Sequence, residues 1–256
     1  MPLSKRSPIL RPLLKLPGQK LDEDLQDFLE DHLLAPIMVL VMIAAMCLVE
    51  WAGYLNNSPR NPWIYTWWFL GAAVVIAIHW RQQWREAARL KLGREGERAV
   101  AEYLNVRLDT DSRVLHGVPL EGATADHVLI CTRGVFVIET KARSLPRRGD
   151  PVVHVADTGL RVNGFKPDRD PIAQTVRYVD ALNRLLPELA TPKIEAIGIV
   201  VFPSYKVVDD RKGNRRVWVL EPKELAYRLD NEPKRLCADD VVFLTRRLAS
   251  YIRPPN

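Results

Sequence analysis

The chain has 256 residues, a formal net charge of +6 and a sequence pI of about 9.3. This length allows one ordinary domain and a smaller additional unit. Its three cysteines, Cys47, Cys131 and Cys237, are far apart in the sequence, which excludes a disulfide framework and a C-x-x-C metal pattern. We therefore expect a reducing compartment and no zinc site.

Residues 1–32 are expected to form a flexible tail and an amphipathic segment next to a membrane. The first 19 residues hold several prolines and basic residues without apolar periodicity. From residue 21 to residue 34, acidic residues alternate with leucine and phenylalanine at helical spacing, which predicts a short amphipathic helix.

Two apolar stretches, residues 33–55 and 62–80, are predicted to be transmembrane helices. Each is close to the roughly 20 residues needed to cross about 30 Å of hydrocarbon. Aromatic residues mark their ends, as is typical of membrane interfaces: Trp51, Tyr54, Trp63, Tyr65, Trp67, Trp68, Trp80 and Trp84. A signal peptide fits poorly because the first stretch begins late and a second one follows. A buried hairpin of a soluble protein is the remaining alternative.

Basic residues flank both outer ends of this hairpin, while the link at residues 56–61 is short and carries one. The positive-inside rule therefore predicts a multi-pass protein of the inner, cytoplasmic membrane with both termini in the cytoplasm. Glu50 and His79 would lie near opposite interfaces. Ionisable groups inside a membrane are often functional, but these terminal positions favour side chains that reach the interface.

Residues 81–256 are predicted to form one domain in which strands and helices alternate. We expect helices at residues 84–104, 171–186, 223–229 and 239–252, and strands at 114–120, 126–131, 135–141, 152–155, 160–162, 194–202 and 217–220. Asp170 is the expected N-cap of the second helix and Pro187 its expected end. Residues 209–216 are expected to be a solvated loop, with nucleic acid or anionic lipid as alternative contacts.

The hairpin of residues 126–141 concentrates charge at one end. Asp126 begins the first strand, whereas Glu139 and Lys141 end the second, so the three residues lie side by side. Side chains alternate along a strand, so Glu139 and Lys141 share a face and Thr140 takes the other. A lone Glu-x-Lys is most often an exposed surface pair. The additional carboxylate of Asp126 weakens this alternative but does not by itself reverse it.

Two carboxylates close together repel each other, and Mg²⁺ relieves such repulsion through hard oxygen ligands. A lysine beside the ion orients or deprotonates water, or stabilises a phosphorane-like transition state.

Two further polar residues are candidates for the same site. Gly93 and Gly96 each cost a helix about 1 kcal/mol relative to alanine, which is reasonable if this helix approaches the sheet closely and brings Glu97 near Asp126. An ordinary exposed glutamate is the alternative. Gln174 lies in the first turn of its helix, where an anion is favoured, although a solvated glutamine is also ordinary there.

The order of these segments resembles the nuclease-related domain, NERD, of the P-D-(D/E)-x-K nuclease superfamily. The resemblance extends over about residues 92–202. It is carried by five blocks in sequence order: Gly93-Arg94-Glu95-Gly96-Glu97, Val114-Leu115-His116-Gly117-Val118, Asp126-His127-Val128-Leu129-Ile130, residues 134–141 and Asp170-Pro171-Ile172-Ala173-Gln174.

This resemblance implies a restriction-endonuclease-like α/β core, a mixed sheet flanked by helices, and hydrolysis of phosphodiesters in DNA with Mg²⁺ or Mn²⁺. Asp126, Glu139 and the Thr140 carbonyl would hold the metal. Lys141 would position or activate water and Gln174 would contact phosphate. The resemblance alone selects Glu97, as a supporting carboxylate or second-metal ligand.

The sequence departs from the family pattern at three places. Ala142 replaces the usual asparagine after the lysine, and Asp170-Pro171 replaces Asn-Pro. The aromatic residue usual between Lys141 and Gln174 is not obvious, which puts substrate contacts there in doubt. Two alternatives stay open: a nucleic-acid-binding module with little catalysis, and a membrane scaffold that binds a protein partner.

Overall fold

The computed structural model describes residues 26, 34–56, 61–107, 109, 111–121, 123–189, 194–212 and 216–252. The chain divides into two compact units: Leu21–Lys91, and Leu92–Asn256 together with Met1–Lys20. Apart from Gln26, the predicted tail and amphipathic segment lie outside the described residues.

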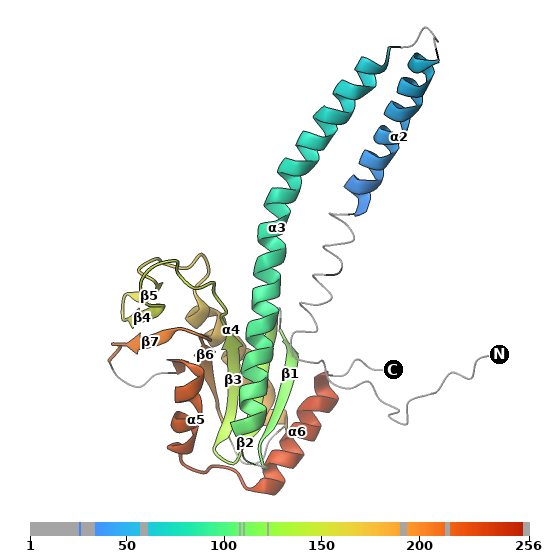
Figure 1. The fold of residues 1–256 in the computed structure, drawn as a ribbon. Coiled ribbons are helices and arrows are strands. Elements are labelled where there is room, and N and C mark those ends of the chain that lie inside the picture. Colours follow the sequence, from blue (N-terminus) through green and yellow to red (C-terminus); the bar gives the residue numbers. More distant parts are fainter. Residues whose placement is uncertain are drawn as a thin grey trace, which may run out of the picture. The chain divides into compact units, whose positions relative to one another are not determined.

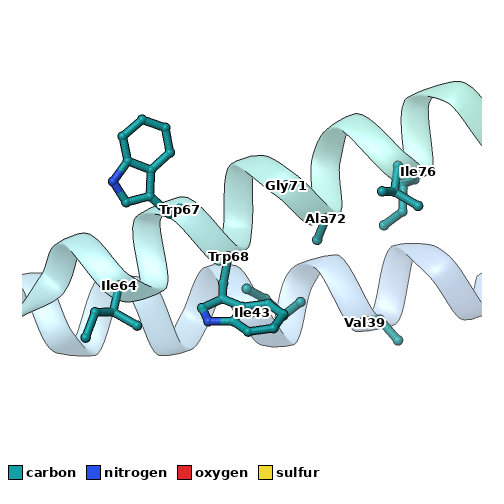
Figure 2. Close-up of a pocket in the computed structure, with 9 residues that line it drawn as sticks. Val39, Ile43, Ile64, Trp67, Trp68, Gly71, Ala72 and Ile76 are labelled. Carbon is teal, nitrogen blue, oxygen red and sulfur yellow. The ribbon is translucent and has the colours of Figure 1, made fainter.

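The first unit contains a pair of long helices. Helix α2 runs over Ala35–Leu55, and α3 begins at Pro62. By length and composition, both are able to cross a membrane. The Trp51 Nε1 donates to Thr66 Oγ1 at 3.0 Å, and the rings of Trp51 and Trp63 meet edge to face. Figure 2 shows the two helices side by side, with an apolar groove between them lined by residues such as Ile43 and Trp68.

The second apolar stretch and the helix predicted at residues 84–104 form one continuous helix, α3, which runs to Arg107. No proline separates the second apolar stretch from the helix predicted at residues 84–104, so nothing in the backbone stops the helix. Residues 92–107 of α3 belong to the second unit.

The second unit is built on a five-stranded mixed sheet in the order β1-β2-β3-β6-β8 (Figure 1). Its strands are β1 Arg113–Leu120, β2 Ala123–Cys131, β3 Gly134–Thr140, β6 Ala196–Val201 and β8 Val217–Leu220. The first three pair antiparallel, whereas β3, β6 and β8 are parallel. The expected mixed α/β sheet flanked by helices is therefore confirmed.

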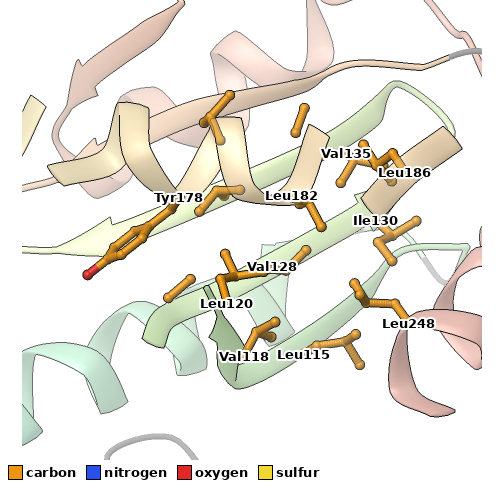
Figure 3. Packing of buried hydrophobic residues seen from close by; sticks show 14 of the residues in the cluster. Leu115, Val118, Leu120, Val128, Ile130, Val135, Tyr178, Leu182, Leu186 and Leu248 are labelled. Carbon is orange, nitrogen blue, oxygen red and sulfur yellow. The ribbon is translucent and has the colours of Figure 1, made fainter. Parts of the chain in front are cut away.

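Helices cover both faces of this sheet. Helix α4, Pro171–Leu189, and helix α6, Ala238–Ile252, pack on one face through a cluster that includes Val128, Leu182 and Leu248 (Figure 3). Residues 92–107 of α3 and helix α5, Pro222–Asp230, cover the other. Strands β3 and β6 lie inside the sheet, which explains their nearly continuous apolar sequences.

A smaller sheet in the order β5-β4-β7 packs beside the larger one. The predicted hairpin is confirmed as β4 Val152–Ala156 and β5 Gly159–Val162, but β7, Lys206–Asp209, was not predicted. Asp209 was assigned to a solvated loop. Instead it ends β7 and accepts two hydrogen bonds from the Arg211 guanidinium.

Pro187 does not end α4, which continues to Leu189. Proline lacks an N–H group and disturbs the preceding turn, but so close to a helix end it removes only one backbone hydrogen bond. Residues 213–215 of the expected loop lie outside the described residues.

Gly96 is where α3 approaches the sheet. A Cβ atom built at Gly96 collides with the Cβ of Ala142, just after β3, and lies 3.6 Å from Thr140 Cγ2. We expect Gly96→Ala to destabilise the second unit by about 1–3 kcal/mol because overpacking outweighs the gain in helix propensity. Thermal unfolding of the full chain measures this. Adding Ala142→Gly to Gly96→Ala should restore part of the lost stability. If the single and double variants lose the same stability, the proposed collision between residues 96 and 142 is contradicted.

Candidate functional site

The site lies at the end of the β2–β3 hairpin opposite its turn. The turn holds two residues, since Cys131 pairs with Gly134, whose φ of 146° suits glycine. From there the register runs to the pair His127–Ile138, which places Asp126 beside the last residues of β3. The backbone N–H of Lys141 donates to the Val201 carbonyl at 2.9 Å, so this end of β3 stays in the parallel part of the sheet.

Asp126 is fixed by the backbone of the neighbouring strand. The Thr140 N–H donates to Asp126 Oδ2 at 2.7 Å. In a strand, the N–H and C=O groups of one residue point to the same side. The Thr140 carbonyl therefore points to the side on which Asp126 lies, where an oxygen ligand was expected.

Glu139 is almost fully buried, with 3% of its surface exposed. Its Oε1 accepts a hydrogen bond from Lys141 Nζ at 2.5 Å, so the expected common face of Glu139 and Lys141 is present. Its Oε2 is buried and has no hydrogen-bond partner among the residues that the structure describes. A buried carboxylate oxygen without a partner is costly unless an ion or water binds there.

Gln174 of α4 joins the same group. Lys141 Nζ donates to Gln174 Oε1 at 3.0 Å, and Gln174 Nε2 donates to the hydroxyl oxygen of Tyr178 at 2.6 Å. In Figure 3 the Tyr178 hydroxyl points away from the surrounding apolar side chains. Lys141 has three N–H donors, and the described residues provide partners for two of them.

Glu97 is half-buried and follows the close approach of Gly96 to the end of β3. It is close enough to Asp126 for its negative charge to raise the pKa of that carboxyl group. The structure therefore brings together the five side chains considered at the sequence level, those of Glu97, Asp126, Glu139, Lys141 and Gln174.

Both strand carboxyl groups have raised pKa values. The pKa of Asp126 lies well above its ordinary range, mainly because the carboxyl group is buried. Repulsion from Glu139 and Glu97 raises this pKa further, whereas the Thr140 N–H and Lys141 lower it. Burial likewise raises the pKa of Glu139, against the opposing effects of Lys141 and Gln174. The protein thus holds two carboxylates where their negative charge is unfavourable without a counterion.

These features fit a divalent cation with oxygen ligands. Asp126, Glu139 and the Thr140 carbonyl are hard donors of the kind that Mg²⁺ and Mn²⁺ use, and the unpartnered Glu139 Oε2 is a direct structural reason to expect an ion. Across the described residues, no group of three or more His, Cys, Asp or Glu side chains is placed to hold a metal. The proposed set has two carboxylates, so water or substrate oxygens would complete it.

Asp126→Asn tests whether the negative charge of this carboxylate destabilises the metal-free chain. Because the pKa of Asp126 is raised, the folded chain binds the proton more tightly than the unfolded chain. This contribution to stability is full below the ordinary pKa of 3.8 and is lost as pH rises through the raised pKa. The variant keeps an acceptor for the Thr140 N–H and removes the charge.

Without metal, we expect Asp126→Asn to melt several degrees above wild type near pH 8 and at the same temperature as wild type near pH 4. In a domain of this size, a change of 1 kcal/mol in the free energy of unfolding shifts the melting temperature by about 2–4 °C. Thermal unfolding of the full chain in detergent and chelator measures this, with Asp111→Asn, an exposed aspartate, as control. A lower melting temperature of the variant at both pH values would contradict the claim that the charge of Asp126 destabilises the metal-free chain.

Two features of the site were not predicted. Tyr178 is one helical turn after Gln174, and this spacing was a usable signal. His116 and His127 form a pair across β1 and β2, with their Nδ1 atoms 2.8 Å apart. Burial lowers the pKa of His127 to about 3, and it also lowers the pKa of His116. Nothing in the sequence distinguished these from ordinary core histidines.

Comparison with protein families matches residues 92–203 to the nuclease-related domain. The predicted resemblance over residues 92–202 is therefore confirmed, and membership of the P-D-(D/E)-x-K superfamily is consistent with it. No curated protein matches the chain.

Among solved structures, the chain is similar to SfsA of Pyrococcus furiosus in complex with Ca²⁺, at 16% identity and a TM-score of 0.25. The match covers 53% of this chain and 54% of SfsA, so the chain spans about half the length of that protein. So low a score carries no argument about the fold. The similarity that remains is the family match, in which residues 92–203 resemble the nuclease-related domain.

Proposed function

We propose that the chain is a membrane-tethered nuclease that hydrolyses phosphodiester bonds in DNA with Mg²⁺ or Mn²⁺, using a restriction-endonuclease-like core. The observation that carries this proposal is the buried Glu139 Oε2, which has no partner among the described residues and lies on the same carboxylate that Lys141 binds. Asp126, at the same end of the hairpin, supplies the second carboxylate.

In this proposal Asp126, Glu139 and the Thr140 carbonyl hold the metal. A divalent ion there supplies Lewis-acid stabilisation of the charge that develops on the phosphoryl oxygens. Glu97 adds a further negative charge that favours binding of the ion.

The other side chains act on the substrate and water. Lys141 is held by Glu139 and Gln174, so its ammonium group has a fixed position and a remaining N–H donor for water or a phosphate oxygen. Gln174 contacts phosphate through the second N–H of its Nε2, so its hydrogen bonds to Lys141 and Tyr178 stay in place. Tyr178 orients Gln174, because its hydroxyl oxygen accepts from the amide nitrogen and leaves the amide oxygen directed to Lys141.

The full chain in detergent, incubated with DNA, tests the enzyme. Cleavage should require Mg²⁺ or Mn²⁺ and stop when chelator is added. A nucleic-acid-binding module with little catalysis is the second candidate, favoured by two exposed arginines beside Lys141, Arg143 and Arg169. Binding without cleavage under every metal condition would select this module and contradict the enzyme.

Membrane tethering rests on the two long apolar helices and their basic flanks. Reporter fusions after Lys20 and after Asn256 should both report the cytoplasm, and a fusion at Ser58 should report the opposite side. A C-terminus outside the cytoplasm would contradict the proposed topology. The proposed nuclease domain would then also be separated from chromosomal DNA.

A further inference from the structure

A cavity of about 190 Å³ adjoins the candidate site, with Lys141 as a shared wall. Arg143 and Arg169 also line it, so three cations face the cavity against one carboxylate, that of Asp168. Coulomb attraction in such a partly enclosed space favours an anion the size of a phosphate group.

The two arginines are available for a ligand. Both side chains belong to exposed residues, and the described part of the chain provides no hydrogen bond or ion pair to either guanidinium. Their backbone is nevertheless held in place. The Tyr205 hydroxyl donates to the Ser144 carbonyl, next to Arg143, at 2.8 Å, and Asp170, next to Arg169, accepts the Ile172 N–H at 2.9 Å.

The backbone of an exposed aromatic residue pairs with a residue of the cavity wall. Phe165 is 79% exposed, and its backbone exchanges two hydrogen bonds with Val162, which lines the cavity. The turn between them is stabilised further, since Asn163 Oδ1 accepts the Val152 N–H and Asn163 Nδ2 donates to the Tyr205 hydroxyl oxygen. A single exposed apolar residue is ordinary, but this one belongs to a stabilised turn that adjoins a basic cavity.

We propose that Phe165 and the cavity of Lys141, Arg143 and Arg169 form a subsite for single-stranded nucleic acid. The cavity binds a backbone phosphate close to the scissile bond, and Phe165 stacks on the adjacent base. This inference rests on the proposed function, because it assigns the strand that reaches Lys141.

A single strand fits these groups better than a duplex does. In a duplex both faces of a base are covered by neighbouring bases, so an aromatic side chain stacks only where the strand is unpaired or splayed. Alternation of cations with an aromatic ring is the usual way to bind single strands without sequence preference. Asp168 limits anion binding on its side, so the phosphate is expected near the arginines.

The test measures binding by the full chain in detergent and chelator, where no metal-dependent cleavage occurs. The probe is a fluorescent oligonucleotide of about ten nucleotides, as single-stranded DNA, as single-stranded RNA and as the DNA duplex. The DNA and RNA arms identify the polymer. Phe165→Ala should weaken single-strand binding about 5- to 150-fold, the equivalent of about 1–3 kcal/mol for one stacked base. Phe165→Trp should retain binding.

Arg169→Ala should instead lower the slope of log affinity against log salt by about 0.7, the value for one phosphate contact in a single strand. Phe165→Ala should leave that slope unchanged. Two controls match these residues in exposure but lie on other elements: Tyr227→Ala on α5 and Arg246→Ala on α6. Both should bind as wild type, and all variants should melt as wild type.

Single-strand binding that is unchanged in Phe165→Ala, or lost equally for single strand and duplex, would overturn the subsite. Its failure is distinct from failure of the proposed function. A chain that cleaves DNA but binds without Phe165 contradicts only the subsite. A chain that never cleaves but binds single strands through Phe165 contradicts only the enzyme.

Discussion

Lys141→Ala is expected to slow single-turnover cleavage at saturating Mg²⁺ by on the order of 100-fold or more, about 3 kcal/mol of transition-state stabilisation. Lys141 Nζ is fixed by Glu139 Oε1 and Gln174 Oε1 within hydrogen-bonding distance. Its loss therefore removes a positioned cation from the place where negative charge develops. An exposed ion pair would behave differently, since its removal alters stability by at most about 1 kcal/mol and changes no catalytic rate.

Metal binding separates these two roles of Lys141 further. A cation beside two carboxylates opposes metal binding, so the affinity for metal should hold or rise in Lys141→Ala. The variant leaves Glu139 buried without its cation, so the metal-free chain should be less stable and should gain more from added metal. Lys206→Ala, an exposed lysine on β7, is the control and should match wild type. Unchanged single-turnover cleavage in Lys141→Ala would rule out the catalytic role.

Glu139→Gln is expected to weaken metal binding by more than about 100-fold and to remove most of the cleavage activity. Substitutions behind the direct ligands already cost about 10- to 100-fold in affinity, and loss of a ligand charge costs more. The variant keeps the shape of the side chain and an acceptor for Lys141 Nζ. It places an amide group where the buried Oε2 now lies, the oxygen that has no partner among the described residues.

Calorimetric titration of Mn²⁺ into the full chain measures the loss of affinity. Glu102→Gln, an exposed glutamate on α3, is the control and should bind metal as wild type does. Glu97→Gln should fall between these two variants if its carboxylate supports the ion without binding it directly. Equal metal affinity in wild type and Glu139→Gln would show that the metal binds elsewhere.

Local sequence patterns predicted most elements of the second unit. The β2–β3 hairpin, the small hairpin and α6 followed from alternation, turn residues and helical periodicity, and their observed bounds differ by a few residues at most. The end of α4 was predicted wrongly, and the strand β7 was not predicted. Pro187 is tolerated in a last turn, and the four residues of β7 gain strand structure by pairing with β4, which no local pattern reveals.

The candidate site was predictable in part for the same reason. Asp126, Glu139 and Lys141 belong to one hairpin, so their proximity follows from register alone. Gln174 and Glu97 come from helices, and only the family resemblance connected them to the hairpin. Arg169 and Val162 of β5 line one cavity with Lys141, and the smaller sheet packs on the larger one, which are tertiary contacts that the sequence does not encode locally.

The central claim is that Asp126 and Glu139 hold the metal at which DNA is cleaved. The most direct measurement follows Mn²⁺ occupancy and single-turnover cleavage together, in the same titration of the full chain. We predict that the cleavage rate rises in proportion to occupancy of the site removed by Glu139→Gln, and that it is negligible when this site is empty. Cleavage that proceeds without occupancy of this site, or full occupancy without cleavage, would contradict the account.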